Sequence, residues 1–209
     1  MMKNLFIAVS VLLGWFAVIA QLVLYIINRT VSLTETLFRF FSYFTILSNI
    51  LVALCFTALL VKPKSAWGRI FTHSKVITGT VVYIIVVSAV YNLVLRQLWN
   101  PEGLQKIVDV ILHSTIPMLF VVHWLFRVPK NELQWKNAFA WLLFPLLYII
   151  LVLIRGSFSN FYPYPFIDVS ESGYNAVLIN CAGLFIIFFV LSLLVIGTGK
   201  LISKYTEED

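Results

Sequence analysis

The chain has 209 residues, of which 61% are hydrophobic and only 11% are charged, and its formal net charge is +6. Soluble domains carry about 25% charged and roughly 45–50% apolar residues. A chain this short cannot hide so much apolar surface in a core, which excludes an ordinary soluble domain and indicates an integral membrane protein. The basic residues are scattered and fall largely between apolar runs, so we expect no nucleic-acid partner.

Six apolar runs are each long enough to cross a hydrocarbon layer of about 30 Å as a helix. They predict a single-domain, all-α bundle of six transmembrane helices, at approximately 4–27, 37–61, 74–95, 107–126, 136–154 and 174–196. The first run exceeds the roughly 7–15 apolar residues of a signal peptide, so we interpret it as a retained helix. Cys55 and Cys181 are expected at depths that differ by roughly 15 Å, which excludes a disulfide between them.

The basic residues also predict the orientation, because cytoplasmic loops are enriched in Lys and Arg. Most of the 15 basic residues fall on the side that holds both termini, which we therefore expect to be cytoplasmic. They are Lys3, Lys62, Lys64, Arg69, Lys75, Arg127, Lys130, Lys136, Lys200 and Lys204. The outer side has Arg29, Arg39, Arg96, Lys106 and Arg155.

Polar side chains collect in the outer half of the expected helices. Thr45 is expected roughly 13 Å below the outer boundary, and His113 roughly 9–13 Å below it. The other members of this layer are Ser42, Ser48, Asn49, Ser88, Tyr91, Asn92, Asp109 and Asn180. The inner halves of the same helices are almost bare of polar groups. A polar layer confined to one leaflet predicts a cavity open to the outside rather than a pathway through the membrane.

Asp109 and His113 are four residues apart, so they stack one turn above the other on a helix. Ionisable groups at membrane depth are costly, which favours a functional role. Pro117 cannot donate a hydrogen bond to the carbonyl of His113, so a free acceptor and a kink are expected there. Pro145 has the same effect on the carbonyl of Trp141.

The outer segment RGSFSNFYPYPFIDVSESG, which includes Arg155 and Tyr164, is rich in aromatic residues and proline. Such residues settle at the headgroup level, and this segment is expected to form a stiff interfacial cap over the polar layer. Each polar residue also has a purely structural interpretation. Hydroxyls inside a helix often bond a carbonyl one turn back, and Asn49, Asn92 and Asn180 are typical of interhelical hydrogen bonding.

The segments RFFSYFTILSN, LWNPEGLQKIVDVILHSTIPMLF and YPYPF resemble the signature segments of the bacterial six-pass Pr-six-Pr family, over nearly the whole chain. More distantly, YFTILSN and VDVILHSTIPM are similar to key segments of the eukaryotic androgen-induced family of membrane hydrolases. Those enzymes cleave fatty acid esters of hydroxy fatty acids with an intramembrane threonine and a histidine. The resemblance implies that these residues are Thr45 and His113, although the sequence departs from the eukaryotic pattern near Ser48 and Asn49.

The implied activity is an intramembrane lipid-ester hydrolase whose substrate is a membrane lipid or fatty acid ester. Thr45 would be the nucleophile and His113 its base, because a threonine hydroxyl needs a base within hydrogen-bond reach. Asp109 would orient the ring or favour the imidazolium, and Asn49, Asn92 or Tyr91 would stabilise the oxyanion. Ser48 and Asn180 are further supporting candidates, chosen by depth. The candidates for contact with the substrate, chosen in the same way, are Ser42, Ser88, Arg155 and Tyr164.

Two other functional classes fit the same residues. A non-catalytic protein that binds a lipid or small molecule would use the same pocket, cap and basic rim, with His113 as a hydrogen-bonding or pH-sensing group. A transporter is less favoured, since nothing polar continues into the inner leaflet and the halves show no obvious repeat. The sequence has no metal-ligand spacing or phosphate-binding loop, and we expect neither a metal nor a cofactor.

Overall fold

The computed structural model describes residues 2–61, 64–98 and 100–207. Across these ranges the chain is helical and has no strand, and its helices form six spans that are long and apolar enough to cross a membrane. The expected six-span, all-α bundle is confirmed. The elements are α1 (Met2–Ile27), α2 (Leu33–Phe41), α3 (Phe44–Val61), α4 (Ala66–Phe71), α5 (Ser74–Leu93), η1 (Leu95–Gln97), α6 (Gly103–Val110), η2 (Ile111–Thr115), α7 (Ile116–Arg127), α8 (Asn137–Trp141), α9 (Leu143–Ser159), η3 (Pro165–Ile167) and α10 (Val169–Glu207).

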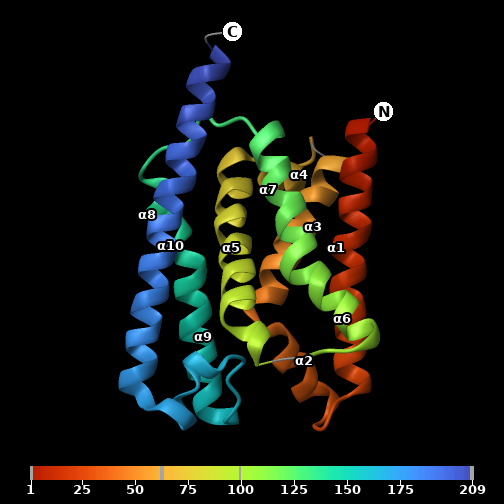
Figure 1. Cartoon of the computed structure of the whole chain (residues 1–209), viewed down its shortest axis with the longest axis vertical. Coiled ribbons are helices and arrows are strands. Elements are labelled where there is room, and N and C mark those ends of the chain that lie inside the picture. The colour runs from red at the N-terminus through yellow and green to blue at the C-terminus, as the bar shows by residue number, and fades with distance from the viewer. Residues whose placement is uncertain (1, 62–63, 99, 208–209) are drawn as a thin grey trace.

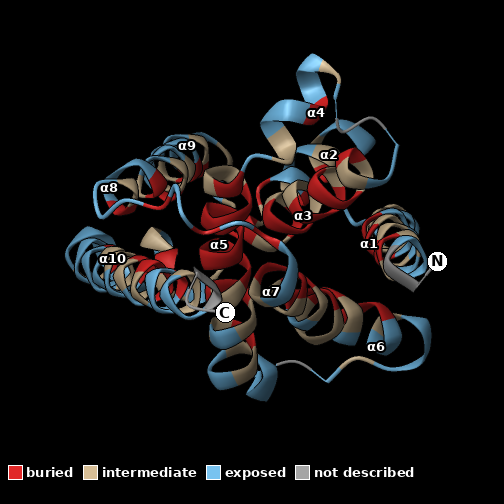
Figure 2. Ribbon diagram, turned by 90° about the horizontal axis from the view of Figure 1, so that it is seen from above, coloured by how far each residue is buried: buried red, intermediate tan, exposed pale blue. Residues whose placement is uncertain are grey.

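Helix α5 lies in the middle of the bundle, between α1, α3 and α7 on one side and α8–α10 on the other (Figures 1 and 2). In the apolar stretch of the span that contains α5, 61% of the residues are buried, whereas in that of α10 only 22% are buried. The core around α5 includes Val81, Ile84, Phe56 and Phe120. The outer faces of α1 and α10 are apolar and exposed, as expected for helices that contact lipid. The first turn of α1 and the last turn of α10 lie at the same end of the bundle (Figure 1). Following the predicted orientation, this end is called the inner end and the opposite one the outer end.

The single helix predicted at 37–61 is wrong, because the structure has two helices, α2 and α3, with a break at Ser42 and Tyr43. The Ser42 hydroxyl donates to the carbonyl of Phe38 (2.7 Å), one turn back in α2. The break leaves the Ser42 carbonyl without a helical partner, and the Tyr148 hydroxyl donates to it (2.9 Å). Thr45 consequently lies in the first turn of α3 rather than deep within a continuous helix.

The other predicted spans differ from the observed helices mainly at their ends. The span expected at 74–95 continues from α5 into η1, and that at 136–154 is divided into α8 and α9. The helix expected at 174–196 is longer at both ends, and Gly173, with φ of 73°, separates its first turn from the rest. Both cysteines are free thiols, as expected.

Trp141 fixes the inner end of α5 against α8. Its indole Nε1 donates to the carbonyl of Lys75 (3.1 Å), and the ring lies against Gly79, where a Cβ atom would be 2.7 Å from Trp141 Cδ1. The carbonyl of Trp141, expected to be free because of Pro145, accepts a hydrogen bond from the Tyr83 hydroxyl (2.8 Å). Gly79 is therefore needed for close contact between these helices.

Candidate functional site

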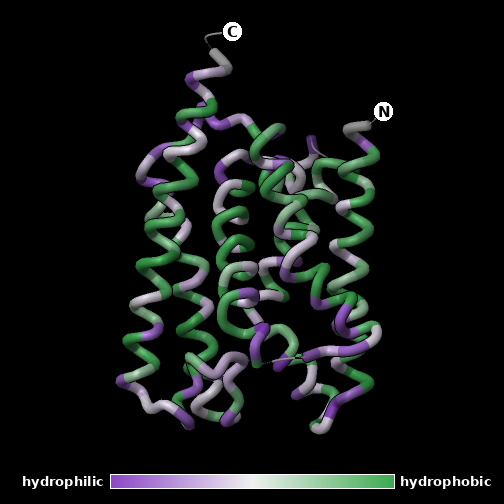
Figure 3. The backbone as a smooth tube through the Cα atoms, in the orientation of Figure 1, coloured by the Kyte–Doolittle hydropathy of each residue, from purple (hydrophilic) through white to green (hydrophobic). Residues whose placement is uncertain are grey.

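A cavity of about 720 Å³ opens between the outer ends of α1, α2, α3, α5 and α6, the η2 turn and the cap segment. Hydrophilic residues gather at this end of the bundle, the lower end in Figure 3. The cavity is lined by several of the predicted site residues, namely Thr45, Tyr91, Asp109, His113 and Tyr164. Pro163 and Pro165 of the cap also line it, as expected for a segment that covers a polar layer.

The span that carries His113 contains a π-helical turn, Ile111–Thr115, between α6 and α7. The N–H of Ile116 donates to the carbonyl of Ile111 rather than to that of Leu112. Pro117 has no N–H, so the carbonyls of Leu112 and His113 both lose a usual helical donor. Single π-turns often occur at functional sites.

Two asparagines from neighbouring helices donate hydrogen bonds to these two carbonyls. Asn49 Nδ2 of α3 donates to the carbonyl of Leu112 (3.2 Å) and also to that of Thr45 (2.9 Å). Asn92 Nδ2 of α5 donates to the carbonyl of His113 (3.3 Å), which confirms that Pro117 exposes this acceptor. Side-chain amides therefore hold the π-turn to α3 and α5. These amide groups are engaged with the backbone, and neither asparagine lines the cavity.

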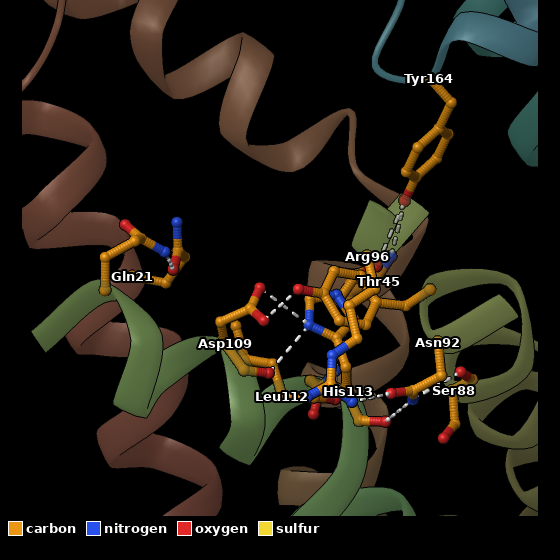
Figure 4. A network of polar contacts seen from close by, with 12 residues as sticks. Gln21, Thr45, Ser88, Asn92, Arg96, Asp109, Leu112, His113 and Tyr164 are labelled. Atoms are coloured by element: carbon orange, nitrogen blue, oxygen red, sulfur yellow. Dashed lines mark hydrogen bonds and ion pairs between the residues drawn. The ribbon is translucent and has the colours of Figure 1, made fainter. Parts of the chain in front are cut away.

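His113 is held by Asp109 and Tyr91. Its Nδ1 lies 2.9 Å from the backbone carbonyl of Asp109 and 3.3 Å from Asp109 Oδ1. Both partners are acceptors, so Nδ1 carries a proton, and a neutral ring then has its lone pair on Nε2. The Tyr91 ring stacks on the imidazole with 3.7 Å between centroids, and its hydroxyl donates to Asp109 Oδ2. These contacts fix the orientation of the ring, and Figure 4 shows those between Asp109 and His113 as dashed lines.

Thr45 contacts the cap through Tyr164. Because Thr45 lies in the first turn of α3, its N–H has no helical acceptor, and it donates to Tyr164 Oη (3.2 Å). Thr45 Oγ1 is 3.3 Å from the same phenolic oxygen. Burial raises the pKa of Tyr164 above its ordinary value, so the phenol is protonated at neutral pH and can donate a hydrogen bond. In Figure 4, Tyr164 points from the cap toward Thr45.

Thr45 and His113 line one cavity, but among the hydrogen bonds of the described residues none joins these two side chains. The threonine hydroxyl is paired with Tyr164, and the histidine uses Nδ1 for Asp109. Proton transfer from Thr45 to His113 therefore needs a different conformation of the Thr45 side chain, or a water molecule that bridges the two groups.

The remaining predicted residues lie outside the cavity lining. Ser48 Oγ is buried and has no hydrogen-bond partner among the described residues, and the Ser88 carbonyl accepts from Asn92 Nδ2 (2.9 Å). Asn180 is exposed on α10, where its Nδ2 donates to the carbonyl of Phe166 (2.9 Å). Ser42 bonds within α2. The structure thus brings together the Thr45, Tyr164 and His113 groups and assigns these other side chains to packing and helix contacts.

Arg155 lies at the outer end of α9 and is already paired. Its Nη2 is 2.7 Å from Glu35 Oε1, and the same oxygen accepts from Arg39 Nε at 2.8 Å. Both guanidinium groups also lie over the ring of Phe161 in the cap, at 4.6 Å for Arg39 and 5.5 Å for Arg155. The pairing with Glu35 was missed from the sequence, because it joins residues 120 positions apart. Arg39, unlike Arg155, lines the cavity.

Acid is expected to weaken the link that Glu35 makes between α2 and α9. The hydrogen bond from Arg39, followed by that from Arg155, lowers the pKa of Glu35 below its ordinary value of 4.5. Because the pKa of Glu35 is lower in the folded than in the unfolded state, its carboxylate stabilises the fold at pH values above the unfolded pKa. This stabilisation is lost as the pH falls through the folded pKa. Wild type should exceed Glu35→Gln in thermal stability by roughly 1 kcal/mol at neutral pH.

Thermal unfolding in detergent, measured at neutral pH and at steps below pH 4.5, tests this. The difference between wild type and Glu35→Gln should shrink as the carboxylate becomes protonated. A difference that stays constant across this range would contradict the role of the ionised Glu35.

No family model, curated protein or solved structure matches this chain. The class defined by the fold is that of a multi-pass, six-span all-α membrane protein. Within the described ranges, His, Cys, Asp and Glu side chains form no group of three or more that could hold a metal ion.

Proposed function

We propose that the protein is an intramembrane lipid-ester hydrolase of the cell membrane, with Thr45 as nucleophile and His113 as general base. The observation that supports it most is the pairing of His113 Nδ1 with Asp109 in the wall of the cavity that Thr45 also lines. This pairing leaves Nε2 as the acceptor, which is the protonation state a general base requires. The substrate is a lipid ester that enters from the outer leaflet.

In the proposed reaction the Thr45 oxygen forms a bond to the ester carbonyl carbon while its proton passes to His113 Nε2. The negative charge on the carbonyl oxygen is stabilised by a hydrogen bond from the Tyr164 hydroxyl, whose oxygen accepts from the Thr45 N–H. The ester C–O bond then breaks, and His113 gives the proton to the leaving alcohol. Water from the cavity hydrolyses the acyl-threonine and restores the hydroxyl.

Tyr164 replaces the oxyanion donors expected from the sequence. Asn49 and Asn92 are engaged with backbone carbonyls, and the Tyr91 hydroxyl donates to Asp109. Tyr164 is the polar group that contacts both the amide and the hydroxyl of Thr45. A protein without chemistry, which binds a lipid or small molecule, is the second candidate, and it is favoured by the pairing of the Thr45 hydroxyl with Tyr164 instead of His113.

A lipid-like fluorophosphonate separates the two candidates, because only an activated hydroxyl forms an adduct with it. We expect wild-type protein in detergent to carry the adduct on Thr45, Thr45→Ala to carry none, and His113→Ala to react about 10²- to 10⁴-fold more slowly. Mass spectrometry locates the adduct. The matched control is His73→Ala, which changes an exposed histidine far from the cavity. Absence of an adduct in folded wild-type protein would refute the hydrolase and favour the binding protein.

A further inference from the structure

Positive charge exceeds negative charge in the lining of the cavity. Among the lining side chains that the structure describes, those of Arg29 and Arg39 are basic and that of Asp109 is acidic. Asp109 is already paired with His113 and Tyr91. Arg29 follows the end of α1, and Arg39 lies in the last turn of α2, both at the outer end of the bundle (Figure 1). The mouth of the cavity is therefore cationic, which favours a ligand with an anionic group.

Arg39 is held in place while its terminal amino groups remain available. Its Nε donates to Glu35 Oε1 (2.8 Å), and its guanidinium lies 4.6 Å from the centroid of the Phe161 ring. Arg155 shares the same carboxylate at 2.7 Å, so these three charged groups keep one positive charge in excess. Among the hydrogen bonds of the described residues, none uses the Nη atoms of Arg39. A stacked guanidinium presents these N–H groups at its edge, in a fork that fits the oxygens of an anion.

Arg29 adds a second guanidinium to the mouth. Its Nη1 donates to the carbonyl of Ile26 (3.0 Å), and the ion pairs of the described residues do not include it. Polar side chains beside it also line the cavity, namely Gln21, Asn28, Thr30 and Gln105. They can satisfy the hydrogen bonds of a polar alcohol such as glycerol, whereas a hydrocarbon chain would leave them unpaired. The mouth therefore suits a polar, anionic alcohol.

The order of these groups across the membrane matches that of a glycerophospholipid. The chain runs inward through α2 to α3, so Thr45, in the first turn of α3, lies deeper than Arg39. In an outer-leaflet phospholipid the phosphate lies at the interface and the ester carbonyls lie just below it. A phosphate held by Arg29 and Arg39 would thus leave an ester inside the cavity that Thr45 lines. The volume of about 720 Å³ lies within the roughly 300–1,000 Å³ of pockets that hold small molecules.

We propose that Arg29 and Arg39 bind the phosphate of a glycerophospholipid, so that the ester attacked by Thr45 joins a fatty acid to a glycerol phosphate. The inference rests on the proposed hydrolase and names its substrate class. Water splits this ester into a fatty acid and a phosphate-bearing alcohol, and the alcohol leaves through the cationic mouth. Both arginines act in binding and contact the phosphate, whereas the reacting atoms lie at Thr45.

Binding to the Thr45→Ala protein tests the phosphate site without catalysis. In a neutral detergent, oleoyl lysophosphatidic acid should bind about tenfold more tightly, or better, than mono-oleoylglycerol, which has the same acyl chain and no phosphate. Dissociation constants are measured on the full chain by microscale thermophoresis. Equal affinities for the two lipids would overturn the proposal. Inorganic phosphate or oleate that bound as tightly as the lysophosphatidic acid would also overturn it, because the ligand would then be a free anion or a carboxylate.

Two variants of the Thr45→Ala protein locate the phosphate. Arg39→Gln and Arg29→Gln should each weaken the binding of lysophosphatidic acid by about tenfold or more and leave that of mono-oleoylglycerol unchanged. Arg29 is exposed, so its replacement keeps the test valid even if Arg39→Gln fails to fold. The matched control is Lys106→Gln, which removes a positive charge from an exposed side chain of α6 outside the cavity lining. The same loss in this control would refute the site.

The binding experiment and the labelling of Thr45 can fail independently. Phosphate-selective binding that needs both arginines supports the site even if no fluorophosphonate adduct forms on Thr45, which refutes only the hydrolase. An adduct on Thr45 without phosphate-selective binding supports the hydrolase and refutes a glycerophospholipid as its substrate.

Discussion

Asp109→Asn is expected to slow fluorophosphonate labelling of Thr45 by about 10²- to 10⁴-fold. The backbone carbonyl of residue 109 still accepts from His113 Nδ1 (2.9 Å), so the proton stays on Nδ1. The substitution removes the carboxylate charge 3.3 Å from Nδ1 that stabilises the imidazolium formed when Nε2 takes the threonine proton. The labelling rate, followed by intact-protein mass spectrometry, measures the effect.

Glu102→Gln is the control for this change, because it alters an exposed carboxylate just before the same helix, α6. It should leave the rate unchanged. A rate for Asp109→Asn equal to that of wild type would show that the Asp109–His113 pair has no part in activating Thr45. The thermal midpoint of each variant establishes that a slow rate reflects chemistry and not unfolding.

Gly79→Ala should destabilise the protein by about 1–3 kcal/mol, the usual cost of overpacking a filled core. The added Cβ would lie 2.7 Å from Trp141 Cδ1 and 2.8 Å from Trp141 Nε1, so the indole must move and lose its bond to Lys75. Thermal unfolding in detergent gives the difference from wild type.

Gly183→Ala is the matched control, since its Cβ would meet nothing within 4 Å on α10. Alanine is the better helix former by about 1 kcal/mol, so this variant should be as stable as wild type or slightly more so. Equal midpoints for the two variants would mean that Trp141 does not require the close approach to Gly79.

The six spans could be predicted from the sequence because length and hydropathy are properties of each segment alone. The break at Ser42 could not, since it depends on Tyr148, about a hundred residues away, which satisfies the freed carbonyl. Proline supplied a usable local signal, and the acceptors that it exposes are indeed occupied by side chains of other helices, Asn92 and Tyr83. Which side chain would fill each acceptor was set by packing and was not predicted.

The candidate site was predictable to the level of depth and helical face. Spacing placed Asp109 one turn from His113, and the two do pair. Depth alone also selected Asn180 and Arg155, but depth does not specify which way a helix is rotated or which partner a charge has. Arg155 therefore proved to be paired with Glu35, and Asn180 with the backbone of the cap.

The π-turn at Ile111–Thr115 makes this part of the chain sensitive to insertion and deletion. A π-turn is what an α-helix forms when it accommodates one additional residue while both flanks keep their contacts. Removing Ile111 or Leu112 would restore regular pairing with both flanks in place, but it would shorten the spacing of Asp109 and His113 from four residues to three, a change of about 100° around the helix. The contact of His113 Nδ1 with the Asp109 carbonyl would then be lost, even though every side chain of the site was still present. The geometry of the cavity wall therefore depends on the number of residues in this segment as much as on their identity.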